Sequence, residues 1–362
     1  MRVVPLALVL LLAPATLGAQ DGWKTDFSKH TVPPDEILSG GPPKDGIPAI
    51  DAPEFVTVDE ADRWLEDREP VILLEESGDA RAYPYQILVW HEIVNDVVGG
   101  RPLVITFCPL CNTALAFDRR HRSRTLDFGV TGMLRHSDLV MYDRQTETWW
   151  QQATGEAIVG RFAGDTLEFV PAQTLRWADF KRAHPDGRVL ARETGHDRPY
   201  GRNPYAGYDQ GGGPMGSFVS GDVDQRLPAM ERVAAVRLGS SSVGYPFSAL
   251  SEGKVVNDTV AGTPIVVFWA PGTASALDER TIARGRDVGS TGVFRSTVGD
   301  EALRFGAAGD GRFRDEATGT TWDLTGRAID GPLRGSRLEP IPHGDYFWFA
   351  WSAFQPDTEI RR

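Results

Sequence analysis

The chain has 362 residues, of which 41% are hydrophobic, so it is long and apolar enough to bury a large core. Its length predicts about two domains. With 50 acidic residues against 38 basic ones, it carries a net charge of −12 and is repelled by nucleic acids and by anionic lipid surfaces. We therefore expect no nucleic-acid partner.

The first residues predict export from the cytoplasm. Arg2 precedes an apolar run at residues 3–12, and the small residues Gly18 and Ala19 follow it. This arrangement is typical of a secretory signal peptide over residues 1–19, and the apolar run is too short to span a membrane. No later stretch is long enough to cross a bilayer. The expected mature protein is periplasmic or secreted and has no transmembrane segment.

The segment at residues 20–68 is expected to be an N-terminal arm that ends in a short helix. Its first part is rich in Pro, Gly and Asp, and Asp59 can cap a helix that runs to Leu65. Short apolar and β-branched runs then predict a series of strands. These strands lie at residues 71–75, 81–83, 103–107, 113–117, 125–130 and 139–142. Helices are predicted at residues 85–94 and 173–183, where apolar residues recur at helical spacing.

The sequence beyond residue 68 contains two similar halves. Tyr83-Pro84, Asn95-Asp96 and Pro109 recur 162 residues later as Tyr245-Pro246, Asn257-Asp258 and Pro271. Residues 131–135 also match residues 291–295, and Trp177 recurs as Trp348. A period this long predicts a tandem duplication of one β-rich α+β domain. We place the repeat domains at residues 69–190 and 231–362, joined by a linker or loop at residues 191–230.

The two halves differ at residues that can perform chemistry. Cys108, Cys111 and His91 of the first half align with Ala270, Thr273 and Gly253 of the second half. Residues that support a fold should remain in both copies, whereas a reactive site needs only one. The site is therefore expected in residues 69–190, and the second copy is expected to be degenerate at the site.

Cys108-Pro-Leu-Cys111 contains both cysteines of the chain and is the predicted centre of the site. Two cysteines at this spacing can bind one metal ion or form a disulfide with each other. Soft thiolates select copper(I), so copper is the favoured ion. His91, His136 and Met141 lie on neighbouring predicted elements and are candidate further ligands.

Three alternatives to a metal site remain open. The cysteines can form a redox-active dithiol that exchanges with a thiol partner, although a strand after the motif disfavours a thioredoxin fold. They can instead form an inert disulfide in a binding or scaffold protein of the cell envelope. In the third alternative, Cys108 is an enzyme nucleophile and His91 is its base.

Five sequence blocks connect the chain to a known family. They are Trp-His-Glu-Ile-Val-Asn-Asp at residues 90–96, Thr-Phe-Cys-Pro-Leu-Cys-Asn-Thr at 106–113, Phe-Gly-Val-Thr-Gly at 128–132, Ser-Asp-Leu-Val-Met-Tyr-Asp-Arg at 137–144, and Arg-Asn-Pro-Tyr at 202–205. In these blocks the chain resembles exported bacterial proteins of the domain-of-unknown-function family number 3179. The resemblance covers nearly the whole mature chain, but it brings no established activity with it.

Together these features predict an exported thiol-dependent protein that binds metal, with copper favoured, or performs redox chemistry. Cys108 and Cys111 are its expected centre, and its expected partner is a metal ion or a thiol. His91 is expected to be an accessory ligand or a proton carrier. Asn112 and Asp138 are expected to be near neighbours that help to hold a cofactor.

Overall fold

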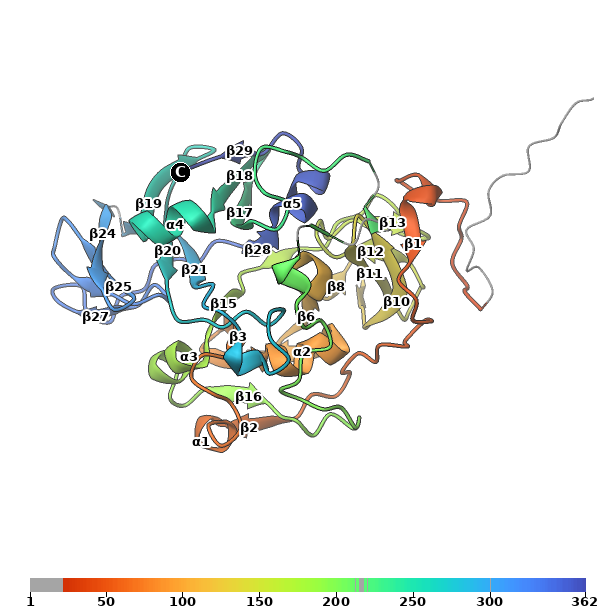
Figure 1. Ribbon diagram of the computed structural model, residues 1–362, viewed down its shortest axis with the longest axis horizontal. Helices are drawn as coiled ribbons and strands as arrows, with labels where there is room; N and C mark the ends of the chain where they lie inside the picture. Colours follow the sequence, from red (N-terminus) through yellow and green to blue (C-terminus); the bar gives the residue numbers. More distant parts are fainter. Residues whose placement is uncertain (1–21, 212, 215–217, 220, 300) are drawn as a thin grey trace, which may run out of the picture.

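The computed structural model describes residues 22–211, 213–214, 218–219, 221–299 and 301–362. The expected signal peptide at residues 1–19 lies outside the described residues. The fold is α+β and rich in β-structure, as predicted, with small sheets and short helices (Figure 1). In Figure 1 the second half, coloured cyan to blue, lies beside the first half, coloured orange to green.

Three larger sheets form the first half. The first contains β15 (Gln173–Arg176), β3 (Pro70–Glu76), β4 (Asp79–Pro84), β16 (Arg188–Leu190) and β2 (Phe55–Thr57). The second contains β14 (Phe169–Val170), β7 (Thr113–Asp118), β6 (Arg101–Cys108) and β5 (Ile93–Val98). The third contains β1 (Ile37–Ser39), β10 (Phe128–Arg135), β11 (Asp138–Asp143), β12 (Trp149–Gln151) and β13 (Ala157–Val159). A small ribbon joins β8 (Arg120–His121) to β9 (Arg124–Thr125), and the helices are α1 (Val58–Ala61), α2 (Tyr85–His91) and α3 (Trp177–Ala183).

The second half also has three larger sheets. The first contains β28 (His343–Phe347), β17 (Arg232–Leu238), β18 (Ser241–Pro246) and β29 (Glu359–Ile360). The second contains β19 (Val255–Val260), β20 (Thr263–Ala270) and β21 (Ser290–Arg295). The third contains β24 (Phe305–Gly309), β25 (Arg312–Asp315), β26 (Thr321–Trp322) and β27 (Ala328–Asp330). A ribbon joins β22 (Thr297–Val298) to β23 (Glu301–Ala302), and the helices are α4 (Phe247–Gly253) and α5 (Trp348–Phe354). Strand β28 contacts β7, which brings the two halves together.

Five consecutive elements occur in the same order in both halves. The series β3, β4, α2, β5 and β6 has the same element lengths as β17, β18, α4, β19 and β20. The side-chain amide of Asn95 donates to the C=O of Phe128 and accepts from its N–H. Asn257 makes the same two hydrogen bonds with Phe305. In each half the asparagine joins the sheet that contains it to a later strand, which is β10 in the first half and β24 in the second. Their role is therefore in the scaffold.

The pairing of β21 differs from what the sequence match at residues 291–295 predicts. β21 pairs with β20, with Ile265 opposite Arg295, just as β7 pairs with β6, with Leu103 opposite Asp118. Strand β24, which receives the Asn257 bonds, takes the place of β10. The shared Thr-Gly pattern was therefore misleading, because a short run of common strand residues matches by chance more easily than a bonded pair does.

Several predicted helices are shorter than expected, because strands occupy part of their residues. Helix α2 ends at His91, and Ile93 and Val94 lie in β5 instead of in the helix predicted over residues 85–94. Residues 173–176 form β15 before α3 begins at Trp177. Helix α1 is capped by Thr57, through reciprocal bonds with Glu60, and not by Asp59. Periodicity does not separate strand from helix in short apolar runs, which explains these errors.

The core extends across both halves and includes the cysteines. Cys108 and Cys111 belong to one buried cluster with Phe347, Trp348 and Trp351 of the second half. These aromatic residues near the C-terminus thus belong to the same core as the cysteines. Across the described residues, no helix combines the length and the apolar character needed to cross a membrane.

Candidate functional site

Both cysteines lie at the end of one β-hairpin. Cys108 is the last residue of β6, and Cys111 ends the short 3-10 turn η2 (Pro109–Cys111) that leads into β7. Pro109 suits the first position of this turn because its φ angle is fixed and it needs no N–H partner. Asn112 closes the turn with a φ of 55°, a left-handed conformation that Asn tolerates. The motif therefore leads into a strand and not into the helix of a thioredoxin fold.

A second hairpin brings a carboxylate to the cysteines. The turn between β10 and β11 consists of His136 and Ser137, whose φ angles are 51° and 67°. Two positive φ angles match the twist of a tight hairpin, but glycine and asparagine usually occupy these positions. Strain of this kind is often found at functional sites. Here the tight turn places Asp138, the first residue of β11, beside the cysteine turn.

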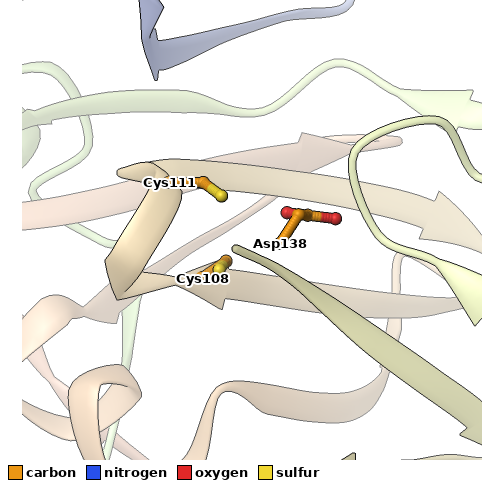
Figure 2. Close-up of side chains that lie close together, drawn as sticks. All are labelled: Cys108, Cys111 and Asp138. Carbon is orange, nitrogen blue, oxygen red and sulfur yellow. The ribbon is translucent and has the colours of Figure 1, made fainter. Parts of the chain in front are cut away.

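Cys108, Cys111 and Asp138 converge in the interior. One ligand atom from each of the three residues lies within 4.8 Å of the other two (Figure 2). Figure 2 shows the two sulfurs on facing sides of the turn with the carboxylate pointing between them. Both cysteines are free thiols, and the three side chains are at most 2% exposed. The arrangement can hold one metal ion or allow the thiols to react with each other.

The Asp138 carboxylate is only half satisfied by the protein. Its Oδ2 accepts hydrogen bonds from the Gln151 amide at 2.6 Å and from the Ala153 N–H at 2.9 Å. Its Oδ1 is buried and has no hydrogen-bond partner among the described residues. Buried polar atoms are normally paired, so an unpaired carboxylate oxygen beside two thiols indicates that something else pairs with it.

Burial favours the protonated form of every acidic group at this site. It raises the pKa of Asp138 to about 7, although hydrogen bonds from Ala153 and Gln151 oppose this rise. Burial also raises the pKa of the Cys108 thiol, and it raises that of Cys111 well above its usual range. The site thus holds several protons at neutral pH, and a bound cation would displace them.

Glu92 is a site residue that the sequence analysis missed. It follows α2 in a left-handed conformation with a φ of 59°, and its C=O accepts the N–H of Phe107 at 2.8 Å, next to Cys108. The pKa of Glu92 is raised to about 8, mainly by burial and also by the Asp138 carboxylate, while a hydrogen bond with Tyr205 opposes the rise. The signal in the sequence was the position of Glu92 directly after the candidate ligand His91.

Tyr205 and Tyr208 pack against the cysteine cluster from the segment between the halves. The Tyr208 hydroxyl donates to the C=O of Leu110, within the cysteine turn, at 2.9 Å. The next residue, Asp209, is anchored to the second half by a buried ion pair with Arg232 at 2.7 Å and by a partly exposed ion pair with Arg286 at 2.8 Å. Residues 205–209 of the expected linker at residues 191–230 therefore form a cover over the site. The second half holds this cover in place.

Removing the Tyr208 hydroxyl should make the thiols more accessible. Tyr208→Phe deletes one hydrogen bond to the cysteine turn, which is worth about 1 kcal/mol, and so favours opening of the cover roughly fivefold. We expect the rate of thiol alkylation by a small maleimide to rise by about that factor. Tyr245→Phe removes a comparable hydroxyl bond to Asp258 in the second half and should leave the rate unchanged. Equal rates in the two variants would show that Tyr208 does not restrict access.

His91 lies beside the site, but its nitrogens are already bonded. Nδ1 lies 2.7 Å from the Pro48 C=O, which only accepts, so Nδ1 donates. Nε2 lies 2.7 Å from the Tyr200 hydroxyl and accepts from it. Burial lowers the pKa of His91 to about 4, which keeps the ring neutral. In this arrangement no lone pair of His91 is free for a metal ion or for a proton from Cys108.

The other two expected ligands occupy different surroundings. His136 lies at the hairpin tip, with Nε2 3.5 Å from Glu36 and the ring against Phe354. Met141 is fully buried in the same cluster as the cysteines, paired across the sheet with Val130 and Trp150. The structure therefore brings Met141 into the shared core, whereas His136 contacts the N-terminal arm and α5.

Asn112 connects the cysteine turn to the second half. Its amide donates to the Asp345 C=O in β28 at 2.9 Å. This bond crosses between the halves at the turn itself. Asn112 thus fixes the position of the turn, and its amide nitrogen is already used by the protein.

The comparisons with known proteins identify a family and leave its activity open. No curated protein and no solved structure matches the chain. One family model does match, and its description reads "Protein of unknown function (DUF3179)". The match extends over residues 44–358 and so includes both halves, the cysteine turn and Asp138. The resemblance read from the sequence blocks is thereby confirmed, and the chain belongs to the DUF3179 family.

Proposed function

We propose that Cys108, Cys111 and Asp138 bind one soft metal ion, and that copper(I) is the favoured ion. The observation that carries this proposal is the unpaired Oδ1 of a fully buried aspartate in a group with two thiols. Thiolates prefer copper(I) and other thiophilic ions. The carboxylate adds a third donor to the two sulfurs.

The charge balance of the site supports a cation. Glu92 and Asp138 are buried with the two thiols, and within the described part of the chain no basic side chain lowers the pKa of Glu92. An unpaired buried charge is costly, so these groups must keep their protons or share a cation. A metal ion would replace the thiol protons and pair with the free Oδ1 of Asp138.

The burial of the thiols favours an ion over a protein partner. Both sulfur-bearing side chains are at most 2% exposed, and Tyr205 and Tyr208 pack against the buried cluster that contains them. Thiol exchange with a partner protein requires direct attack on an accessible sulfur. A single ion can pass through a much smaller opening in the cover.

The affinity for copper(I) should rise with pH. Because burial raises the pKa of both thiols, each loses its proton only when the metal binds. Each proton released strengthens binding by about tenfold per pH unit, so we expect a rise of roughly tenfold to hundredfold from about pH 6 to 7. Competition with a chelator of known pH dependence measures this slope. An affinity that did not change with pH would contradict binding by these thiols.

Dithiol–disulfide exchange is a second candidate, favoured by the position of the Asp138 carboxylate beside the Cys111 thiol. With a pKa of about 7, Asp138 can accept the Cys111 proton near neutral pH. Oxidation would join the two sulfurs and pass two electrons and two protons to a partner disulfide, which becomes two thiols. This candidate predicts that the reduced protein converts oxidised glutathione to thiols and does not retain copper(I).

We also infer a tandem duplication and a location outside the cytoplasm. The equal order and lengths of five elements in each half, and the matching bonds of Asn95 and Asn257, support the duplication. The apolar run at residues 3–12 supports export. Superposing residues 69–190 on 231–361 tests the first inference. Sequencing the mature N-terminus, expected near residue 20, tests the second.

A further inference from the structure

A cavity of about 280 Å³ lies between the two halves. Its apolar walls come from Leu115 and Phe169 of the first half, and from Leu238, Tyr346 and Trp351 of the second. Clefts between domains are frequent sites for small ligands, and this volume is slightly below the usual range of about 300–1,000 Å³. The cavity therefore suits a compact molecule of one or two rings.

The polar groups of the cavity favour a negatively charged ligand. Arg237 and His343 line it, and none of its lining residues is an aspartate or a glutamate, in a chain with 50 acidic residues against 38 basic ones. The Nδ1 of His343 already faces the Ile341 C=O at 2.9 Å, which leaves Nε2 as its other polar atom. A cavity with a cation and no carboxylate attracts anions.

One wall residue also has an unused hydrogen-bond donor. The indole of Trp351 is 5% exposed, and its Nε1 is buried with no acceptor in the part of the chain that the structure describes. Leaving a buried N–H unpaired has a free-energy cost, which an acceptor atom on a ligand would remove. Aromatic walls add stacking and edge contacts with a flat ring.

Two lining residues, Tyr346 and Ala153, connect the cavity to the cysteine site. The Tyr346 hydroxyl donates to the Ala153 C=O at 3.4 Å, and both residues line the cavity. The N–H of the same Ala153 donates to Asp138 Oδ2 at 2.9 Å. A molecule in the cavity would thus lie one residue away from the Asp138 carboxylate.

We propose that this cavity is a binding site for a small aromatic acid, a one- or two-ring molecule that carries a carboxylate. The ring packs against Phe169, Tyr346 and Trp351, and the carboxylate faces Arg237 at the rim. The proposal goes beyond metal binding and does not depend on it, because none of the cavity contacts named here uses a cysteine.

Titration calorimetry with 2-naphthoate tests the proposal on the whole mature chain. We expect saturable binding of one naphthoate per chain. Arg237→Gln should weaken it by about tenfold, the usual effect of losing a charge-assisted hydrogen bond. Arg304 is 72% exposed and its nearest carboxylate is Glu316, so Arg304→Gln is the matched control and should bind as the unaltered protein does. Neutral 2-naphthylmethanol should bind more weakly than naphthoate.

A second variant separates cavity binding from binding elsewhere. Ala235 lines the cavity from β17, and Ala235→Leu adds volume into it. This variant should lose naphthoate binding, while its circular dichroism checks the fold. If Ala235→Leu does not fold, the Arg237→Gln comparison decides alone. No saturable binding, or equal affinity in Arg237→Gln and Arg304→Gln, overturns the proposal.

Discussion

Replacing either cysteine is expected to abolish the retention of copper(I). Cys108→Ser and Cys111→Ser each exchange a soft sulfur for a hydroxyl oxygen, which is a poor ligand for a soft ion. Changes to groups that only support metal ligands already reduce affinity by about 10- to 100-fold, so loss of a direct ligand should exceed about 100-fold. Competition with a copper(I) chelator measures the affinity of each variant.

The second half offers matched controls for these variants. Ala270 and Thr273 occupy the positions that align with the cysteines, so Ala270→Ser and Thr273→Ser should leave copper(I) binding unchanged. Asp138→Asn should weaken binding without abolishing it, because both sulfurs remain. If both cysteine variants retained copper(I) as tightly as the unaltered protein, the site would be elsewhere.

Replacing either of the two tryptophans at matching positions of the two halves should strongly destabilise the protein. Trp177 and Trp348 begin α3 and α5, lie 171 residues apart and are both fully buried. Trp177→Ala and Trp348→Ala should each lower the free energy of unfolding by about 3–5 kcal/mol, because each leaves a large cavity. Urea unfolding monitored by circular dichroism measures the change, provided that the transition is two-state.

A surface residue provides the control for the tryptophan variants. Val97 is 49% exposed on β5, so Val97→Ala should change stability by less than about 0.5 kcal/mol. Equal, small effects in all three variants would contradict the packing described for α3 and α5. A large effect at Trp177 alone would show that the second half contributes little to the stability of the first.

The strand that leads into the cysteines could be predicted because its pattern is unambiguous. Residues 103–107 are apolar, β-branched or aromatic, and β6 extends over Arg101–Cys108. The C-terminal end of α2 was harder to predict, because Ile93 and Val94 continue the helical spacing of apolar residues but belong to β5. Their strand pairing with Ile105 and Thr106 is a long-range contact, and local spacing does not reveal such contacts.

Only some of the residues of the site could be predicted from the sequence. Asp138 was expected near the cysteines, yet its contact with them depends on a strained two-residue turn at His136 and Ser137. His91 and Glu92 are adjacent, so they point in different directions, and the sequence does not show which one faces Cys108. The left-handed conformation of Glu92 decides this by turning the chain into β5.

The cover over the site depends on contacts between the halves and was the least predictable feature. Tyr208 donates to the Leu110 C=O, and the next residue, Asp209, is held by Arg232 and Arg286 of the second half. These partners are separated by long stretches of sequence, and each looks like an ordinary loop or strand residue. They also suggest a reason to keep a second half without cysteines, since it holds the cover in place.

The most direct test of the metal site is a copper(I) titration of the fully reduced protein under anaerobic conditions. A chromophoric copper(I) chelator competes for the ion, and its absorbance reports how much metal the protein takes. The site formed by Cys108, Cys111 and Asp138 predicts that the protein removes one equivalent of copper(I) per chain and then stops. A chelator that keeps all of its copper(I) in the presence of excess reduced protein would contradict the metal site.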